Sequence, residues 1–77
     1  MQEVKLVLNS MDKVKKFVQT ITKFDGEFDM VSGKYVVDAK SIMGIFSVDL
    51  SKPVVLQIHA EENEEDEILK AIQEFME

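Results

Sequence analysis

The apolar residues of this chain change their spacing several times, and each change marks the start of a different kind of secondary structure. Over residues 4–8 they fall at every second position, which is typical of a strand with one buried face. From residue 11 to residue 24 they recur at steps of three and four, which predicts a helix with one apolar stripe. We expect Ser10 or Asn9 to cap this helix at its start, and Gly26 to end it in a left-handed conformation.

A hairpin and a short helix are expected in the middle of the chain. Residues 27–31 and 34–37 are predicted to form the two strands of the hairpin, because Gly33 can supply the positive φ that a tight turn requires. Ser41 is then a good N-cap for a helix of about two turns. Gly44 lies inside that helix, where glycine costs about 1 kcal/mol relative to alanine. It therefore indicates a close backbone approach or a surface that another molecule contacts.

A last strand and a last helix complete the pattern. Residues 54–60 follow Pro53, and their alternation predicts a strand that buries its even-numbered side chains. Asn63 is expected to cap a final helix with acidic residues in its first turn and an apolar stripe that continues to Met76. The resulting order is β-α-β-β-α-β-α. It predicts an α+β fold in which the helices cover one face of an antiparallel sheet and leave the other face to water.

Composition restricts the function classes that need to be considered. The length corresponds to one domain, residues 1–77, with a net charge of −6 and no arginine, which makes nucleic-acid binding improbable. No apolar run approaches the ~20 residues that span a bilayer, the first residues lack the features of a signal peptide, and there is no cysteine. We therefore expect a cytoplasmic protein without membrane insertion.

Catalytic and metal-binding motifs are also missing from the sequence. The single histidine, His59, has no cysteine or second histidine with which to form a metal site, so we expect no metal. The chain contains no glycine-rich phosphate loop, no catalytic triad and no convincing pair of carboxylates. We expect neither an enzyme nor a bound cofactor.

One segment is specific enough to suggest a family. Residues 40–47 read Lys-Ser-Ile-Met-Gly-Ile-Phe-Ser, and this stretch resembles the second helix of HPr, the small phosphocarrier of the bacterial sugar phosphotransferase system. Residues 17–24 look like the first helix of the same family, and no gap is needed between the two segments. The resemblance covers nearly the whole chain. It implies an open-faced β-sandwich with three helices on one face of a four-stranded antiparallel sheet.

The resemblance also reveals a departure at the active site of the family. There a His-Ala-Arg-Pro motif opens the first helix, and its histidine takes phosphate from enzyme I and passes it to the sugar-specific transporters. Without gaps this motif falls on Ser10, Met11, Asp12 and Lys13, and all four positions differ. A serine hydroxyl is not activated without a neighbouring base, and Asp12 would repel the phosphate. The resemblance therefore implies a member without histidine phosphotransfer, similar to the catabolite-repression paralogue of HPr.

Ser41 has two interpretations. From its spacing alone it is the N-cap of a helix and nothing more. In Gram-positive relatives the matching serine is phosphorylated by HPr kinase/phosphorylase, so the resemblance implies a regulatory phosphorylation site. It also implies that Ile42, Met43 and Phe46, together with Met11, form a surface for partner proteins such as the kinase and a transcriptional regulator. We expect the chain to be a monomer or a weak dimer.

Two other functions remain open at this point. The chain could be a working phosphocarrier that uses a non-standard residue, either Ser10 or His59. It could also be a diverged HPr fold with an unrelated interaction role, in which Ser41 only caps a helix. A Ser41→Ala variant distinguishes these ideas, because a regulatory switch would lose its modification whereas a cap would lose only about 1 kcal/mol of stability.

Overall fold

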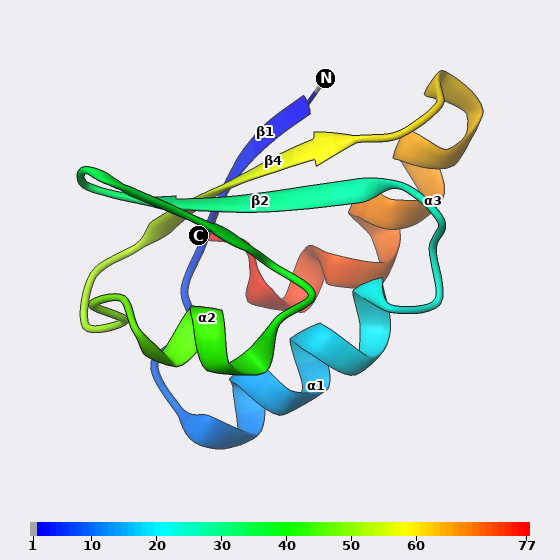
Figure 1. The fold of residues 1–77 in the computed structure, drawn as a ribbon. Helices are drawn as coiled ribbons and strands as arrows, with labels where there is room; N and C mark the ends of the chain where they lie inside the picture. The colour runs from blue at the N-terminus through cyan, green and yellow to red at the C-terminus, as the bar shows by residue number, and fades with distance from the viewer. Residues whose placement is uncertain (1) are drawn as a thin grey trace.

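A computed structural model describes residues 2–77, which form a four-stranded antiparallel sheet with helices packed against one face (Figure 1). The elements in chain order are β1 (Gln2–Leu6), α1 (Met11–Ile21), β2 (Glu27–Ser32), β3 (Tyr35–Asp38), α2 (Ile42–Phe46), β4 (Val54–His59), α3 (Glu62–Ile72) and a 3₁₀ turn, η1 (Gln73–Phe75). This order confirms the predicted β-α-β-β-α-β-α arrangement and the α+β class.

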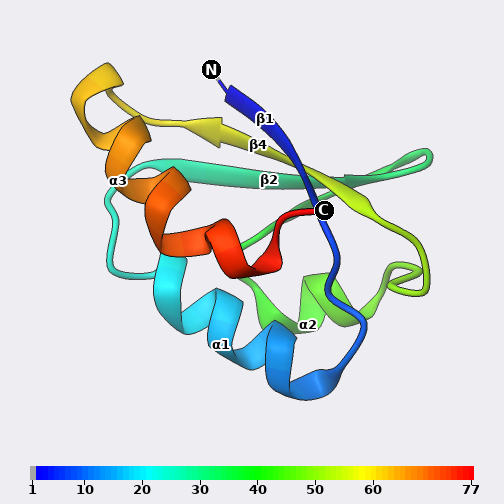
Figure 2. The same ribbon diagram turned by 180° about the vertical axis from the view of Figure 1, so that it is seen from behind.

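The strands lie in the order β1-β4-β2-β3, so that β4 and β2 are central and β1 and β3 are the edges. In the register of the central pair, Phe28 lies opposite Ile58 and Met30 lies opposite Leu56. These four side chains are all buried, which means that both strands turn the same face toward the helices. Figure 2 shows α1 and α3 on that side of the sheet. The opposite face carries no helix in the part of the chain that the structure describes.

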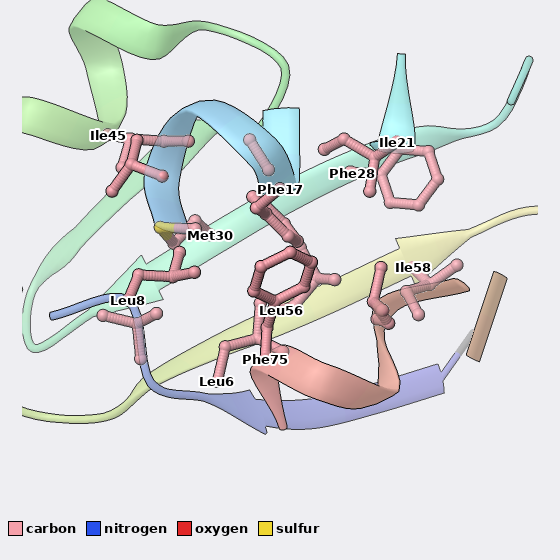
Figure 3. Packing of buried hydrophobic residues seen from close by; sticks show 14 of the residues in the cluster. Leu6, Leu8, Phe17, Ile21, Phe28, Met30, Ile45, Leu56, Ile58 and Phe75 are labelled. Atoms are coloured by element: carbon pink, nitrogen blue, oxygen red, sulfur yellow. The ribbon is translucent and has the colours of Figure 1, made fainter. Parts of the chain in front are cut away.

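The core lies between the sheet and the helices (Figure 3). Phe17 of α1 and Phe75 of η1 meet edge to face, with ring centroids 5.7 Å apart. Ile45 is the fully buried residue that α2 contributes. Burial of a side chain of this size contributes about 1.5–3 kcal/mol, so these contacts, more than the helix caps, hold the helices on the sheet.

The end of α1 differs from the prediction. The helix stops at Ile21, with Thr22 as its C-cap in the right-handed region, and the Thr22 hydroxyl donates to the carbonyl oxygen of Val18 at 2.6 Å. Among residues 2–77 the positive φ is found at Gly33 (60°), as expected for the hairpin, and not at Gly26. A Cβ atom at Gly26 would lie 2.8 Å from the Ala60 Cβ atom. Glycine is required there because the loop passes close to the end of β4.

The start of α3 also differs from the prediction. The helix begins at Glu62 with Glu61 as its N-cap, so Asn63 lies inside the first turn and does not cap it. The carbonyl oxygen of Glu61 accepts hydrogen bonds from the amides of Glu64 (2.9 Å) and Glu65 (3.2 Å). Acidic side chains in the first turn complement the helix dipole, as predicted. The backbone hydrogen bonds to Glu61 and the negative charges of the first turn thus stabilise the start of this helix.

Several other boundaries shift by one or two residues. β1 spans Gln2–Leu6 and not residues 4–8, because its pairing with β4 ends at Val54, next to a proline that cannot donate to the ladder. Leu8 is nevertheless buried below the sheet. α2 has five residues and is therefore shorter than the expected two turns. β4 ends at His59, one residue earlier than predicted.

Candidate functional site

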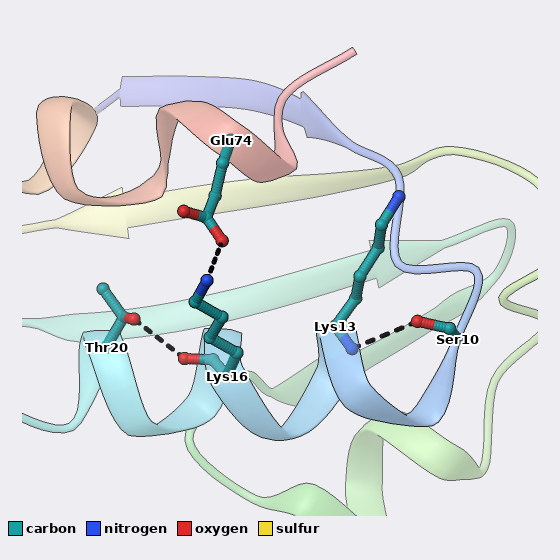
Figure 4. Close-up of polar contacts among 5 residues, drawn as sticks. All are labelled: Ser10, Lys13, Lys16, Thr20 and Glu74. Atoms are coloured by element: carbon teal, nitrogen blue, oxygen red, sulfur yellow. Dashed lines mark hydrogen bonds and ion pairs between the residues drawn. The ribbon is translucent and has the colours of Figure 1, made fainter.

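Ser10 lies at the start of α1 and caps it, as expected (Figure 4). Its Oγ atom accepts a hydrogen bond from the backbone amide of Lys13 at 3.2 Å, and its carbonyl oxygen accepts from Val14 at 3.1 Å. The side chain of Lys13 extends away from the Ser10 hydroxyl in Figure 4. Within residues 2–77 no carboxylate or imidazole is hydrogen-bonded to this hydroxyl.

The neighbouring lysine on α1 has a structural partner. Lys16 Nζ lies 3.0 Å from an oxygen of Glu74, in the segment that contains η1, and both side chains are largely exposed. An exposed pair of this kind contributes about 0–1 kcal/mol. This ion pair lies about two turns along α1 from Ser10 and connects the helix to the C-terminal segment.

Ser41 caps α2 in the same way. Its Oγ atom accepts a hydrogen bond from the backbone amide of Gly44 at 3.1 Å, and its carbonyl oxygen accepts from Ile45 at 3.0 Å. A Cβ atom at Gly44 would lie 3.3 Å from the Ser41 Oγ atom and 3.5 Å from the Val37 Cβ atom. At Gly44 the short helix therefore lies close to the side chain of its own cap and in ordinary van der Waals contact with Val37 of β3.

The lysine before Ser41 is engaged elsewhere. Lys40 Nζ donates to the carbonyl oxygen of Phe24 at 2.6 Å and lies 5.4 Å from the centroid of the Phe28 ring. Its backbone amide donates to a carboxylate oxygen of Asp38 at 2.9 Å. The Lys40 ammonium thus stabilises the packing of the loop after α1, and the hydroxyl of Ser41 has a backbone amide as its partner.

Three large apolar side chains of the predicted partner surface are exposed. The exposed fractions are 81% for Met43, 60% for Met11 and 46% for Phe46, whereas Ile42 is only partly exposed and packs against the core. Met11 and Phe46 line one groove of about 410 Å³ together with Leu8, Asn9, Ser10, Leu50 and Ser51. The structure thus joins the start of α1 and the end of α2 into one apolar surface. Ser41 lies at the other end of α2 and does not line this groove.

The sequence did not indicate that Leu50 and Ser51 belong to this groove. They come from the loop between α2 and β4, where Asp49 accepts hydrogen bonds from the hydroxyl (2.6 Å) and the backbone amide (2.9 Å) of Ser51. These two bonds lower the pKa of the exposed Asp49 carboxyl. An Asp-x-Ser spacing is the signal that could have identified this turn.

His59 lies far from both serines in the sequence and on the open face of the sheet. Its Nε2 atom is 3.2 Å from a carboxylate oxygen of Asp29, and its register partner across the strands is Glu27. The imidazole is exposed, as expected. Among residues 2–77 no three histidine or acidic side chains gather in a way that could hold a metal ion. In the same residues, no helix has the length and apolar character needed to cross a bilayer.

Known proteins resemble this chain in sequence and in fold. Residues 12–77 match the family described as the "PTS HPr component phosphorylation site", where PTS is the phosphotransferase system. A crystal structure of HPr from Thermoanaerobacter tengcongensis is 31% identical, with a TM-score of 0.79 over 96% of this chain and 89% of that one. The histidine-containing phosphocarrier protein of Mycoplasma is 14% identical, with a TM-score of 0.75 over 95% of this chain and 89% of that one, and this likeness concerns the fold alone.

Proposed function

The chain belongs to the HPr family of the phosphotransferase system, and from this membership we propose that it is a regulatory binding protein that does not carry phosphate on a histidine. Members of this family are phosphocarriers that interact with other proteins of the system, and they are not enzymes. This regulatory role depends on the chemistry of three places: Ser10, Ser41 and the exposed apolar side chains near them.

The first part of the proposal is that the start of α1 does not transfer phosphate. Histidine phosphotransfer uses a neutral imidazole nucleophile that forms a labile bond to phosphorus. Ser10 supplies a hydroxyl whose hydrogen bond comes from the amide of Lys13, and this interaction helps to cap the helix rather than to remove a proton. Asp12 in the first turn adds a negative charge that opposes a phosphate. These features support a binding role for this region.

The second part is that phosphorylation of Ser41 regulates the protein. The observation that supports this regulatory role is the position of the Ser41 hydroxyl. Ser41 directly precedes α2, and its hydroxyl is partly exposed and accepts a hydrogen bond from the amide of Gly44. Phosphate oxygens on Ser41 could accept from the same amide, so modification would leave the helix start satisfied. It would add about −1.5 to −2 charges two residues from the exposed Met43.

The third part is that Met11, Met43 and Phe46, with Ile42 beside them, contact partner proteins. Exposed methionines adapt to different partner surfaces, and exposed apolar side chains that share a groove, as Met11 and Phe46 do, mark interaction sites. The partners that fit the family are HPr kinase/phosphorylase and a transcriptional regulator. A phosphate beside this surface would alter binding through its charge and leave the fold unchanged.

The experiment that tests this proposal measures the intact mass of the protein after incubation with ATP and an HPr kinase/phosphorylase. Ser41→Ala is the test variant. Ser47→Ala is a matched control, because Ser47 lies at the other end of α2 and its hydroxyl donates to the carbonyl oxygen of Gly44 at 2.6 Å. We expect one phosphate on the wild type and on Ser47→Ala, and none on Ser41→Ala. An unmodified wild type beside an authentic HPr that is labelled in the same tube would overturn the assignment of Ser41.

A further inference from the structure

β3 is an edge strand that carries exposed apolar side chains. One of its sides pairs with β2, and the other side is open, since no segment in the part of the chain that the structure describes pairs with it. Tyr35 and Val36 are 69% and 62% exposed. The other edge strand, β1, carries the charged Glu3 and Lys5, and the last residues of the chain bond to its end, where Glu77 donates to the carbonyl oxygen of Lys5 at 3.0 Å. β3 carries one charged residue, Asp38, whose carbonyl oxygen accepts from the backbone amide of Ser41 at 3.0 Å, so this edge is protected at that end and exposed at Tyr35 and Val36.

The backbone of β3 directs alternate residues toward this open edge. The amide of Ala39 donates to the carbonyl oxygen of Phe28 at 2.9 Å, so residues 28 and 39 form a hydrogen-bonded pair in the ladder. Hydrogen-bonded and non-hydrogen-bonded pairs alternate along an antiparallel ladder. The pair Val31–Val36 is therefore of the second kind, and the amide and carbonyl groups of Val36 point away from β2.

From this arrangement we propose that β3 pairs in antiparallel fashion with β3 of a second copy of this chain. A two-fold axis through Val36 places the backbone of Val36 opposite the backbone of the partner's Val36. The free amide and carbonyl groups of each Val36 then face those of the other copy, in positions where they can form hydrogen bonds. The strand pairing would produce one eight-stranded sheet with helices along one side. The unpaired amide and carbonyl groups of Val36 offer a template for such an edge-to-edge contact, whereas the Asp38 carbonyl oxygen already accepts from the amide of Ser41 at 3.0 Å.

The side chains in this register complement one another. Lys34 lies opposite the partner's Asp38, and because of the two-fold axis this opposite-charge pair occurs twice. Tyr35 lies opposite the partner's Val37, on the face toward the helices. A register shifted by one residue would put side chains on the wrong faces, and a shift by two residues would lose the Lys34 pairing. Charge complementarity thus selects a second copy of this chain over an arbitrary extended peptide.

The open face of the sheet supports the same arrangement. Val55, Val31 and Val36 lie in one row across β4, β2 and β3. Pairing through β3 would continue this row into the three matching valines of the second copy and cover exposed surface of Val36. The net charge of −6 on each copy opposes association. We therefore expect a weak, reversible dimer.

The test is sedimentation velocity of the full chain from about 10 µM to about 1 mM, the range in which weak interfaces associate. Val36→Lys is the test variant, since it puts a lysine opposite a second lysine on the two-fold axis. Gln2→Lys is the matched control, since it places the same new side chain on the other edge strand with the same change in net charge. We expect the wild type and Gln2→Lys to associate equally, and Val36→Lys to associate at least tenfold more weakly.

A second pair of variants makes the test independent of any effect on folding. Lys34→Asp and Asp38→Lys should each be monomeric alone, and a mixture of the two should associate because both charge pairs are restored across the heterodimer. Circular dichroism shows whether each variant is folded. A wild type that stays monomeric over the whole range would overturn the proposal. So would equal weakening by Gln2→Lys and Val36→Lys, since the contact would then not be specific to β3.

Discussion

The hydroxyl of Ser41 and the backbone amide of Gly44 are joined by a hydrogen bond of 3.1 Å at the start of α2. Ser10 makes the matching bond to the amide of Lys13 at 3.2 Å, so the proposed regulatory serine and the serine at the start of α1 are both caps of their helices. At Ser41 the capping role and the proposed regulatory role therefore have to be separated by experiment.

Replacement of either cap should lower stability by a similar amount. We expect Ser41→Ala and Ser10→Ala each to reduce the free energy of unfolding by about 1 kcal/mol, because one amide at each helix start loses its acceptor. Urea denaturation followed by circular dichroism measures this change. A loss of more than about 3 kcal/mol for Ser41→Ala would mean that this residue does more than cap the helix, and its kinase assay would then need a capping residue without a hydroxyl, such as Ser41→Asn.

The glycines should respond to alanine in different ways. Gly26→Ala should cost about 1–3 kcal/mol, because its Cβ atom would meet the Ala60 Cβ atom at 2.8 Å and the carbonyl oxygen of His59 at 2.9 Å. Gly44→Ala should be close to neutral. The gain in helix propensity of about 1 kcal/mol there offsets the tighter contact with the Ser41 hydroxyl at 3.3 Å. Thermal unfolding of the two variants checks this order. A Gly44→Ala protein that is less stable than Gly26→Ala would contradict the geometry of both sites.

Ser51 should control the titration of Asp49. The pKa of Asp49 is lowered from its usual 3.8, first by the hydrogen bond from the Ser51 hydroxyl and then by the one from its amide. Since the pKa is depressed in the folded state, the associated stability is present above 3.8 and is lost as the pH falls through the lower folded value. Ser51→Ala should move the pKa of Asp49 upward toward 3.8, as followed by carboxyl carbon chemical shifts. An unchanged pKa would show that the hydroxyl bond is unimportant.

Met43 and Ile45 separate binding from folding within α2. Met43 is 81% exposed and Ile45 is fully buried. We expect Met43→Ala to change the free energy of unfolding by less than about 0.5 kcal/mol and to weaken contact with the kinase, which raises its KM for this substrate. Ile45→Ala should lose about 2–5 kcal/mol of stability. If Met43→Ala were phosphorylated with an unchanged KM, Met43 would not belong to the partner surface.

The order of the elements could be predicted because it depends on local patterns. The stripe that includes Phe17 and Ile21, the alternation that buries Leu56 and Ile58, and the Gly33 turn are each contained in a short segment. Helix ends were less predictable. Gly26 was expected to end α1, whereas its real role is set by contact with Ala60 at the far end of β4.

The candidate site was predictable only in part for the same reason. The caps at Ser10 and Ser41 follow from local sequence. The family resemblance implied a partner surface that includes Met43 and Phe46, and both side chains are exposed. The groove that joins Met11 to Phe46 depends on how α1 and α2 pack. Leu50 also enters it from a separate loop. The spacing of apolar residues within one segment does not indicate which distant segments it will contact.

The most direct test of the account compares the intact mass of one preparation after two separate incubations. The first contains phosphoenolpyruvate and enzyme I, and the second contains ATP and HPr kinase/phosphorylase, each with authentic HPr as a positive control. The account predicts an unchanged mass in the first incubation and one phosphate, located at Ser41, in the second. Phosphate acquired from enzyme I, at Ser10, His59 or any other residue, would contradict the central claim that this member of the HPr family does not carry phosphate from enzyme I.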